Sequence, residues 1–323
     1  MNRLRNIVCI PLIFMLAAAA TAQDGYPTKP VRFVAPYPPG GSSDVMARVL
    51  AQKLTDALGR QVIVENRPGA AGNIGHELVA KSPADGYTLL LTTKSQMVNN
   101  QYLYKKLPFD PLNDFAHITM IAYSGHVLVV HPAVPVRTVK ELIALARKQP
   151  GKLSYGSAGL GSTVNIVAEV FKSIEKLDIV HVPYKGAVLA VADVAGGQIE
   201  MVFSDMVPAV PQIRGNRLRA LAVTTAERSP ALTSVPTMAE SGVKDELPTQ
   251  WWGVVGPKGM PAAIVTRLNS EIHRIVNLPD VKERYVDLGI MPLLTTTERM
   301  HDTVKIEGPK TAKALAAIGL KPE

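Results

Sequence analysis

A turn rich in proline, glycine and serine joins an apolar stretch at residues 31–35 to an amphipathic stretch that starts at residue 44. Prolines stiffen the backbone, glycines let it approach a bound group closely, and Ser42 or Ser43 can cap a helix. The first amides of such a helix attract an anion. The turn therefore predicts an anion site, with a tight turn that binds nothing as the alternative. Its residues are Tyr37, Pro38, Pro39, Gly40, Gly41, Ser42, Ser43 and Asp44.

A second loop of the same construction, residues 156–163, lies between an apolar stretch and a segment with helical spacing. If the two loops face each other across a cleft, their helix starts can share one carboxylate without any arginine. Each start contributes roughly 0.3–1 kcal/mol when exposed and up to ~2 kcal/mol when partly buried. Two ordinary tight turns are again the alternative. The candidate ligand-binding residues of this loop are Ser157, Gly159, Gly161, Ser162 and Thr163.

Patterns that mark common enzyme classes are missing. Ser157 lacks the glycine two positions earlier that a nucleophile elbow needs, because Tyr155 stands there. Val164 occupies the place of the third glycine of a dinucleotide fingerprint, and no P-loop lysine is present. No metal-ligand spacing is found among His76, His117, His126, His131, His181, His273 and His301. We therefore expect no catalytic residue, cofactor or metal, and an enzyme ranks as the third hypothesis.

Other candidates follow predicted strands, because open α/β sheets bind ligands outside the carboxyl ends of their strands. Lys94 and Ser95 follow the strand predicted at residues 87–93. Asp205 ends another strand, where its carboxylate could accept a hydrogen bond from a ligand or simply cap a loop. Three aromatic residues could wall the cleft or belong to a core: Tyr37, Tyr184 and Trp251.

Short apolar runs alternate with amphipathic segments, a pattern typical of βαβ units and a mainly parallel sheet. The chain of about 300 residues after the leader is long for one core, so two domains are expected. Thr138 and Glu141 form a capping box at the start of a helix. We expect one lobe from residues 23–125 plus 233–323 and an inserted second lobe from residues 126–232, joined by two crossovers.

The N-terminus has the features of a secretory signal peptide. Arg3 and Arg5 precede an apolar run over residues 7–20, and the small-residue pattern ending at Ala22 predicts cleavage after that residue. The only cysteine, Cys9, would leave with this peptide, so the mature chain has no thiol or disulfide. An exported, cysteine-free chain without a second spanning segment suits the periplasm.

The charge excludes one class of partner. The net charge of +8 drops by two when Arg3 and Arg5 are removed, and the remaining excess is spread along the chain. A basic stripe interleaved with aromatic residues is missing, so nucleic-acid binding is a poor hypothesis. A mild preference for anionic solutes is the most that this charge supports.

Many motifs in the right order resemble the Bug-type periplasmic solute-binding receptors of tripartite tricarboxylate transporters. The similarity covers the mature chain almost from end to end. The motifs are Tyr26-Pro27, Lys29-Pro30-Val31-Arg32, Pro36-Tyr37-Pro38-Pro39-Gly40-Gly41 with Asp44, Val64-Glu65-Asn66-Arg67-Pro68-Gly69-Ala70, Pro83-Ala84-Asp85-Gly86-Tyr87-Thr88, Pro150-Gly151-Lys152-Leu153, His181-Val182-Pro183-Tyr184-Lys185-Gly186, Leu218-Arg219-Ala220-Leu221-Ala222-Val223-Thr224 and Trp252-Gly253.

The resemblance implies an α/β protein with the type II periplasmic-binding-protein fold, in which two α/β lobes close over a ligand cleft. It implies a monomeric, non-enzymatic receptor that hands a small carboxylated solute to the membrane permease subunits of such a transporter. In the family, two glycine- and serine-rich loops pinch a carboxylate, and here those loops are residues 39–43 and 157–163. The segment 203–208 departs from the family's usual run, so the role of Asp205 in specificity stays open.

Two questions remain open at this point. A dicarboxylate, an amino acid, a nicotinate-like ring acid and an aromatic dicarboxylate all fit a shared carboxylate grip. The same fold could also serve a periplasmic sensor that signals to a two-component histidine kinase. The family of the neighbouring genes, permease or kinase, would separate transport from sensing.

Overall fold

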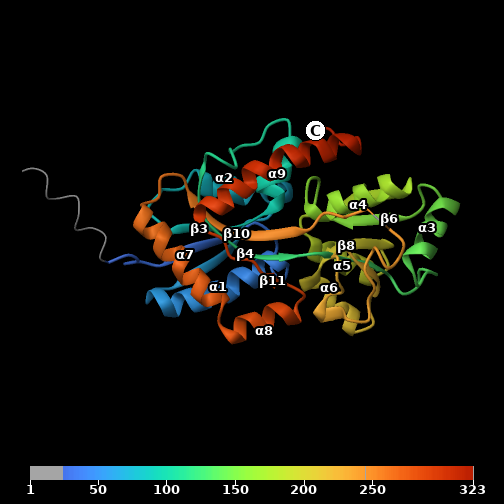
Figure 1. Cartoon of the computed structure of the whole chain (residues 1–323), viewed down its shortest axis with the longest axis horizontal. Helices are drawn as coiled ribbons and strands as arrows, with labels where there is room; N and C mark the ends of the chain where they lie inside the picture. The colour runs from blue at the N-terminus through green and yellow to red at the C-terminus, as the bar shows by residue number, and fades with distance from the viewer. Residues whose placement is uncertain (1–24, 244, 323) are drawn as a thin grey trace, which may run out of the picture.

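The computed structural model describes residues 25–243 and 245–322 and contains two α/β lobes side by side (Figure 1). The signal peptide and its cleavage site lie outside these residues. Within the described ranges, no helix is long and apolar enough to cross a membrane.

The first lobe is built on a six-stranded mixed sheet with the order β11-β4-β10-β3-β1-β2. β1 pairs in parallel with β2 and β3, whereas β10 runs antiparallel to β3 and β4. The two faces are covered by different helices, because successive strand residues point to opposite faces. Phe33 joins the core under α1, α7 and α8, and Val34 joins the core under α2 and α9.

The first lobe contains six strands and five helices among the described residues. The strands are β1 (Val31–Ala35), β2 (Val62–Asn66), β3 (Thr88–Thr93), β4 (Phe115–Ser124), β10 (Gln250–Pro257) and β11 (Met291–Pro292). The helices are α1 (Ser42–Leu58), α2 (Asn73–Ala80), α7 (Ala262–Val276), α8 (Pro279–Asp287) and α9 (Thr297–Ala317), with short turns η1 (Ala70–Gly72), η2 (Ser95–Asn99) and η3 (Asn100–Tyr102).

The second lobe has a five-stranded sheet with the order β7-β6-β8-β5-β9, also mixed. Its strands are β5 (His126–Val130), β6 (Ser154–Ser157), β7 (Val180–Pro183), β8 (Met201–Asp205) and β9 (Arg219–Val223). One face is covered by α3 and α4 and the other by α5 and α6. The helices are α3 (Val139–Lys148), α4 (Thr163–Glu175), α5 (Ala187–Ala195) and α6 (Met206–Arg214), with the turn η4 (Pro230–Leu232).

Two segments carry the chain between the lobes. β4 continues through Gly125 into β5, and the return leads into β10 (Figure 1). The return comes later than the expected boundary at residue 232, because Met238, Val243 and Leu247 pack in a core cluster of the second lobe. The second lobe therefore extends to about residue 247.

Several expectations need correction. The sheets are mixed rather than mainly parallel, since strands that enter from the other lobe run against their neighbours. The 10-residue strand β4 is not among the strands that the sequence predicts. Ser95 and Gln96, expected in a loop with Lys94, begin the helical turn η2, which η3 follows. The last helix, expected over about residues 297–318 with an interruption near Gly308 and Pro309, is continuous through Pro309.

The capping box at α3 is confirmed and gives a stability prediction. Thr138 accepts a hydrogen bond from the Glu141 amide, and the Glu141 carboxylate accepts one from the Thr138 amide. Replacing Thr138 with Ala is expected to lower the free energy of unfolding by ~1 kcal/mol, because an orphan amide loses its partner. Urea denaturation measures this loss. Glu141→Gln retains a capping-box side chain and is the control; equal losses in both variants would contradict the assignment.

Candidate functional site

A cavity of about 20 Å³ lies between the lobes and is enclosed by residues of both. That volume holds about one water molecule. Its walls are formed by Tyr37, Pro38, Gly41, Ser42, Ser43, Ala158, Ser162, Thr163, Val164, Gly186, Ala187, Val188, Asp205, Gln250 and Trp252. Both predicted loops thus reach the same cavity.

The first loop presents the start of α1 to this cavity. Gly41 is the residue that precedes the helix, and it makes no side-chain capping bond. The expectation that Ser42 or Ser43 caps the helix is therefore wrong; both are the first helical residues, buried in the cavity wall. Their amides have no partner within a helix, and their hydroxyls lie beside them.

Asp44 holds the first loop in shape. Its carboxylate accepts hydrogen bonds from the Gly40 amide at 3.0 Å, from Arg48 at 3.0 Å and from Asn66 at 2.9 Å. Burial alone would raise the pKa of Asp44, but these donors together lower it, so the group stays ionised. Asp44, Gly40 and the exposed Pro39 are outside the cavity wall, although we expected all three to bind the ligand.

The second loop presents the start of α4. Ser162 is its capping residue, with its hydroxyl accepting from the Asn165 amide at 3.3 Å. Gly159 and Gly161 have φ values of 103° and 81°, which glycine tolerates best, and they shape the turn without lining the cavity. Ser157 also lies outside the wall, where its hydroxyl contacts His181 Nε2 at 2.6 Å.

Lys94 and Ser95 lie next to the cleft but outside the cavity wall. The Lys94 ammonium pairs with Glu307 at 3.2 Å. The Ser95 hydroxyl accepts a hydrogen bond from the Thr163 amide at 3.1 Å, which links the two lobes. The structure therefore gives both residues partners within the protein.

The predicted aromatic walls are corrected in part. Tyr37 does line the cavity, and its hydroxyl donates to the carbonyl of Ala71 at 3.1 Å. Tyr184 lies outside, donating to Asp193 at 2.6 Å. Trp251 donates to Glu307, and its neighbour Trp252 lines the cavity instead, because adjacent strand residues face opposite sides of the sheet.

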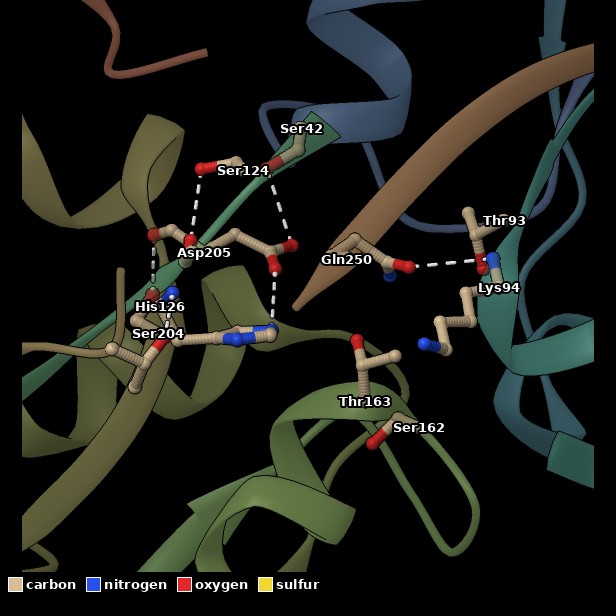
Figure 2. A network of polar contacts seen from close by, with 12 residues as sticks. Ser42, Thr93, Lys94, Ser124, His126, Ser162, Thr163, Ser204, Asp205 and Gln250 are labelled. Atoms are coloured by element: carbon tan, nitrogen blue, oxygen red, sulfur yellow. Dashed lines mark hydrogen bonds and ion pairs between the residues drawn. The ribbon is translucent and has the colours of Figure 1, made fainter. Parts of the chain in front are cut away.

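Asp205 reaches the cavity from the end of β8, just before α6. Its Oδ2 accepts a hydrogen bond from the Ser42 hydroxyl of the other lobe at 3.2 Å (Figure 2). Its Oδ1 lies 3.6 Å from His126 Nε2, too far for a hydrogen bond, and accepts none from the residues that the structure describes. This buried carboxylate oxygen is directed toward His126 and has no hydrogen-bond donor among the described residues (Figure 2).

The charges of this pair follow from burial. Burial raises the pKa of Asp205 to about 6, although the Ser42 hydroxyl opposes the rise. Burial lowers the pKa of His126 to about 4, so its imidazole is neutral at pH 7. Asp205 is therefore ionised at pH 7 without a cationic partner in His126, and it gains a proton just below neutrality.

Sequence reasoning missed several walls of the cavity. Gly186, Ala187 and Val188 form the start of α5, which is a third helix start at the site, and Asp205 precedes a fourth, α6. A sequence signal for this third start was available. Gly186 lies between the end of a strand and the start of a helix, as the glycines of the other two loops do. The remaining missed residues are Ala158, Val164, Gln250 and Trp252.

Known proteins share both the sequence and this architecture. The family model described as "Tripartite tricarboxylate transporter family receptor" matches residues 46–320. Protein BugT of Bordetella pertussis is 35% identical over 322 residues, which cover 99% of each chain.

Solved structures include ligand-bound ones. Rpa4515 of R. palustris with adipate superposes with a TM-score of 0.90 at 34% identity, covering 92% of this chain and 100% of that one. MatC of Rhodopseudomonas palustris with bound malate gives a TM-score of 0.86 at 26% identity, covering 90% and 100%. A ligand-free TctC solute-binding protein from Polaromonas, also at 26% identity, covers 90% and 99% with a TM-score of only 0.62.

The resemblance noted in the sequence and the periplasmic-binding-protein fold are both confirmed by these matches. The family consists of solute-binding receptors rather than enzymes, which agrees with the expectation that no residue is catalytic. The chain belongs to the receptor family of the tripartite tricarboxylate transporters, to which the Bug proteins also belong.

Proposed function

We propose that this receptor captures a small carboxylated solute in the periplasm by closure of its lobes and delivers it to a membrane permease. The observation that carries the proposal is the meeting of three helix starts, from both lobes, at one cavity. Delivery to a permease is supported by the transporter named in the family description. Export is supported by the signal-peptide pattern that ends at Ala22, and the receptor acts as a monomer.

The grip on a carboxylate would come from dipoles rather than from a cation. Among the described residues of the cavity wall there is no lysine or arginine. A helix start favours an anion by up to ~2 kcal/mol when partly buried, and several starts act together here. In α4 the Thr163 amide already donates to Ser95, so the later amides of that first turn are the ones left for an anion. The hydroxyls of Ser42, Ser43, Ser162 and Thr163 line the same cavity and can donate to the carboxylate.

Asp205 would define the far end of the ligand. Its free Oδ1 needs a hydrogen-bond donor, which a hydroxyl, an ammonium or a protonated carboxyl group supplies. An ionised second carboxylate would instead be repelled unless Asp205 takes up a proton, and its raised pKa makes this proton uptake easy. The adipate and malate of the two solved relatives make dicarboxylates the first solutes to test.

Lobe closure is supported by the geometry of the cleft. A solute of several carbon atoms cannot enter a cavity of about 20 Å³ enclosed from both sides, so the lobes must separate to admit it. The two solved relatives of equal identity point the same way. The one with malate superposes much better than the one without ligand, as expected if receptors of this family have two lobe arrangements.

A thermal-shift screen tests capture. A solute present at 100 times its dissociation constant adds ~2.7 kcal/mol to the stability of the folded state, equivalent to a rise in Tm of roughly 5–10 °C. We expect at least one member of a panel of mono- and dicarboxylates, beginning with adipate and malate, to give this rise. Adipamide, without a charge, is the control. If no carboxylate stabilises the receptor, the proposal fails.

Gly186→Ala tests closure. Its φ of −179° is extended backbone that alanine adopts without strain, but the new Cβ would lie 2.6 Å from Cδ of Pro38 across the cleft. Overpacking of this kind costs ~1–3 kcal/mol, so we expect the Kd for a bound carboxylate to rise at least about tenfold. The Tm without ligand should stay within about 2 °C, because the clash arises only when the lobes meet.

The matched control is Gly196→Ala, at the other end of α5. Its Cβ would meet only atoms of the second lobe, 3.4 Å or more away, so binding should be unchanged. Equal affinities of Gly186→Ala and the wild type, measured by isothermal titration calorimetry, would contradict closure at this contact.

The pH dependence of affinity tests Asp205. With a pKa of about 6, this group is almost entirely ionised at pH 8 and half protonated at pH 6. For a dicarboxylate such as adipate, the affinity should rise more than about tenfold between pH 8 and pH 6, because only protonated Asp205 donates to the far carboxylate. Asp205→Asn should bind tightly at both pH values. A pH dependence that persists in this variant would show that another group titrates.

A further inference from the structure

An apolar cluster joins the two lobes at a place separate from the cavity. Leu103 follows η3, and Leu315 lies near the end of α9, both in the first lobe; Ile166 lies on α4 in the second. All three are at least 95% buried. Figure 1 shows α9 running over the first lobe with its C-terminal end directed toward α4. Partly buried neighbours extend the cluster: Tyr102, Tyr104, Val170, Ile318 and Leu320.

Polar contacts from the same part of the first lobe hold the anion-binding loop of the second. The Ser95 hydroxyl accepts from the Thr163 amide at 3.1 Å, and the Tyr104 hydroxyl donates to the Leu160 carbonyl at 3.1 Å. Asn99 donates to the Gly161 carbonyl at 3.4 Å. The segment from η2 to Tyr104 therefore forms hydrogen bonds with the loop that we assign to the carboxylate.

The loop fits closely against this segment. A Cβ on Gly161 would lie 2.6 Å from Oδ1 of Asn100 and 3.2 Å from Leu103, so no larger residue fits there when the lobes are together. The side chains that grip the loop are absent from the cavity wall described above: Ser95, Asn99, Leu103 and Tyr104. Ser95 occupies the Thr163 amide, and the other three side chains contact the loop without lining the cavity.

We propose that residues 95–104 and the end of α9 form an interlobe latch with Ile166 of α4. The latch stabilises the closed arrangement and positions the loop 159–163 without touching the solute. This inference rests on the proposed closure, and it adds that closure has a driving force of its own. Apolar surface that leaves water only when the lobes meet favours the closed state whether or not a ligand is present.

The consequence for binding is thermodynamic. When only a fraction of the receptor is in the binding-competent arrangement, the apparent Kd equals the intrinsic Kd divided by that fraction. A latch that raises this fraction tightens binding of every solute that the cavity accepts. The latch then changes the affinity for every solute alike. The cavity wall also contributes to affinity, and it alone sets selectivity between solutes.

The experiment measures the distance between the lobes without ligand. Because the chain after the leader has no cysteine, Lys106→Cys and Ser173→Cys can carry two spin labels on exposed positions at either side of the latch. Double electron–electron resonance then gives the populations of the short and long distances. Leu315→Ala and Ile166→Ala each remove part of the latch from opposite lobes. Ile306→Ala, an exposed residue of the same helix, is the matched control.

We expect the short-distance population of the ligand-free receptor to be at least about fivefold smaller in Leu315→Ala and Ile166→Ala than in the wild type and Ile306→Ala. Adipate at saturation should restore the short distance, with a Kd raised by a similar factor in the first two variants. Equal populations in all four proteins would overturn the latch. If neither adipate nor any other carboxylate binds, the proposed function fails, while the ligand-free distances still decide the latch.

Discussion

In the proposed function, the attraction between helix starts and an anion is the interaction on which the site depends. Each start offers only a small free energy, since its partial charge amounts to about half an elementary charge. Several starts, at 42–43, 163–164 and 187–188, must therefore meet in a place from which water is excluded. One lobe cannot supply both the number and the enclosure. The two-lobe architecture, with helices that begin where strands end, satisfies both requirements.

Because helix dipoles would hold the carboxylate, the ionised side chains near the cavity can make contacts within the protein instead. Asp44 uses its charge to hold the first loop, and Lys94 pairs with Glu307 beside the cleft. Asp205 is different, because it is buried beside a neutral histidine and retains an oxygen without a donor. A site that attracts an anion at one end and presents a carboxylate at the other has a built-in polarity. That polarity would orient a solute with two unlike ends.

The contacts between the lobes are divided between the cavity and its surroundings. Ser42 reaches Asp205 inside the cleft, whereas Leu103, Ile166 and Leu315 meet outside it. The apolar contact resembles part of a core that has been divided between two lobes, and it is formed without any polar group of the ligand. A receptor arranged in this way can change its solute by changing the cavity wall while keeping the same contact between its lobes. This separation suits a family whose solved members bind different carboxylates.

Local signals in the sequence determined much of the fold and the outline of the site. The spacing of apolar residues predicted most helices and strands, and the capping residue Thr138 lies where its helix begins. The two glycine- and serine-rich loops could be recognised because dihedral preferences and caps act between residues close in the chain. β4, by contrast, was assigned to no element, and its 10 residues carry the chain between lobes.

Only the tertiary structure decided which residues line the cavity. Trp252 rather than Trp251 lines the cavity because of the orientation of β10 in its sheet. Asp44 is hydrogen-bonded to Asn66, which is distant in sequence, and Ser95 is hydrogen-bonded to Thr163 of the other lobe. The third helix start, at Gly186, joins the site through the docking of one lobe on the other. The sequence therefore indicated the two loops that bring helix starts to the cavity. The packing of the two lobes decided which residues line the cavity, because contacts across a cleft produce no periodic pattern in the sequence.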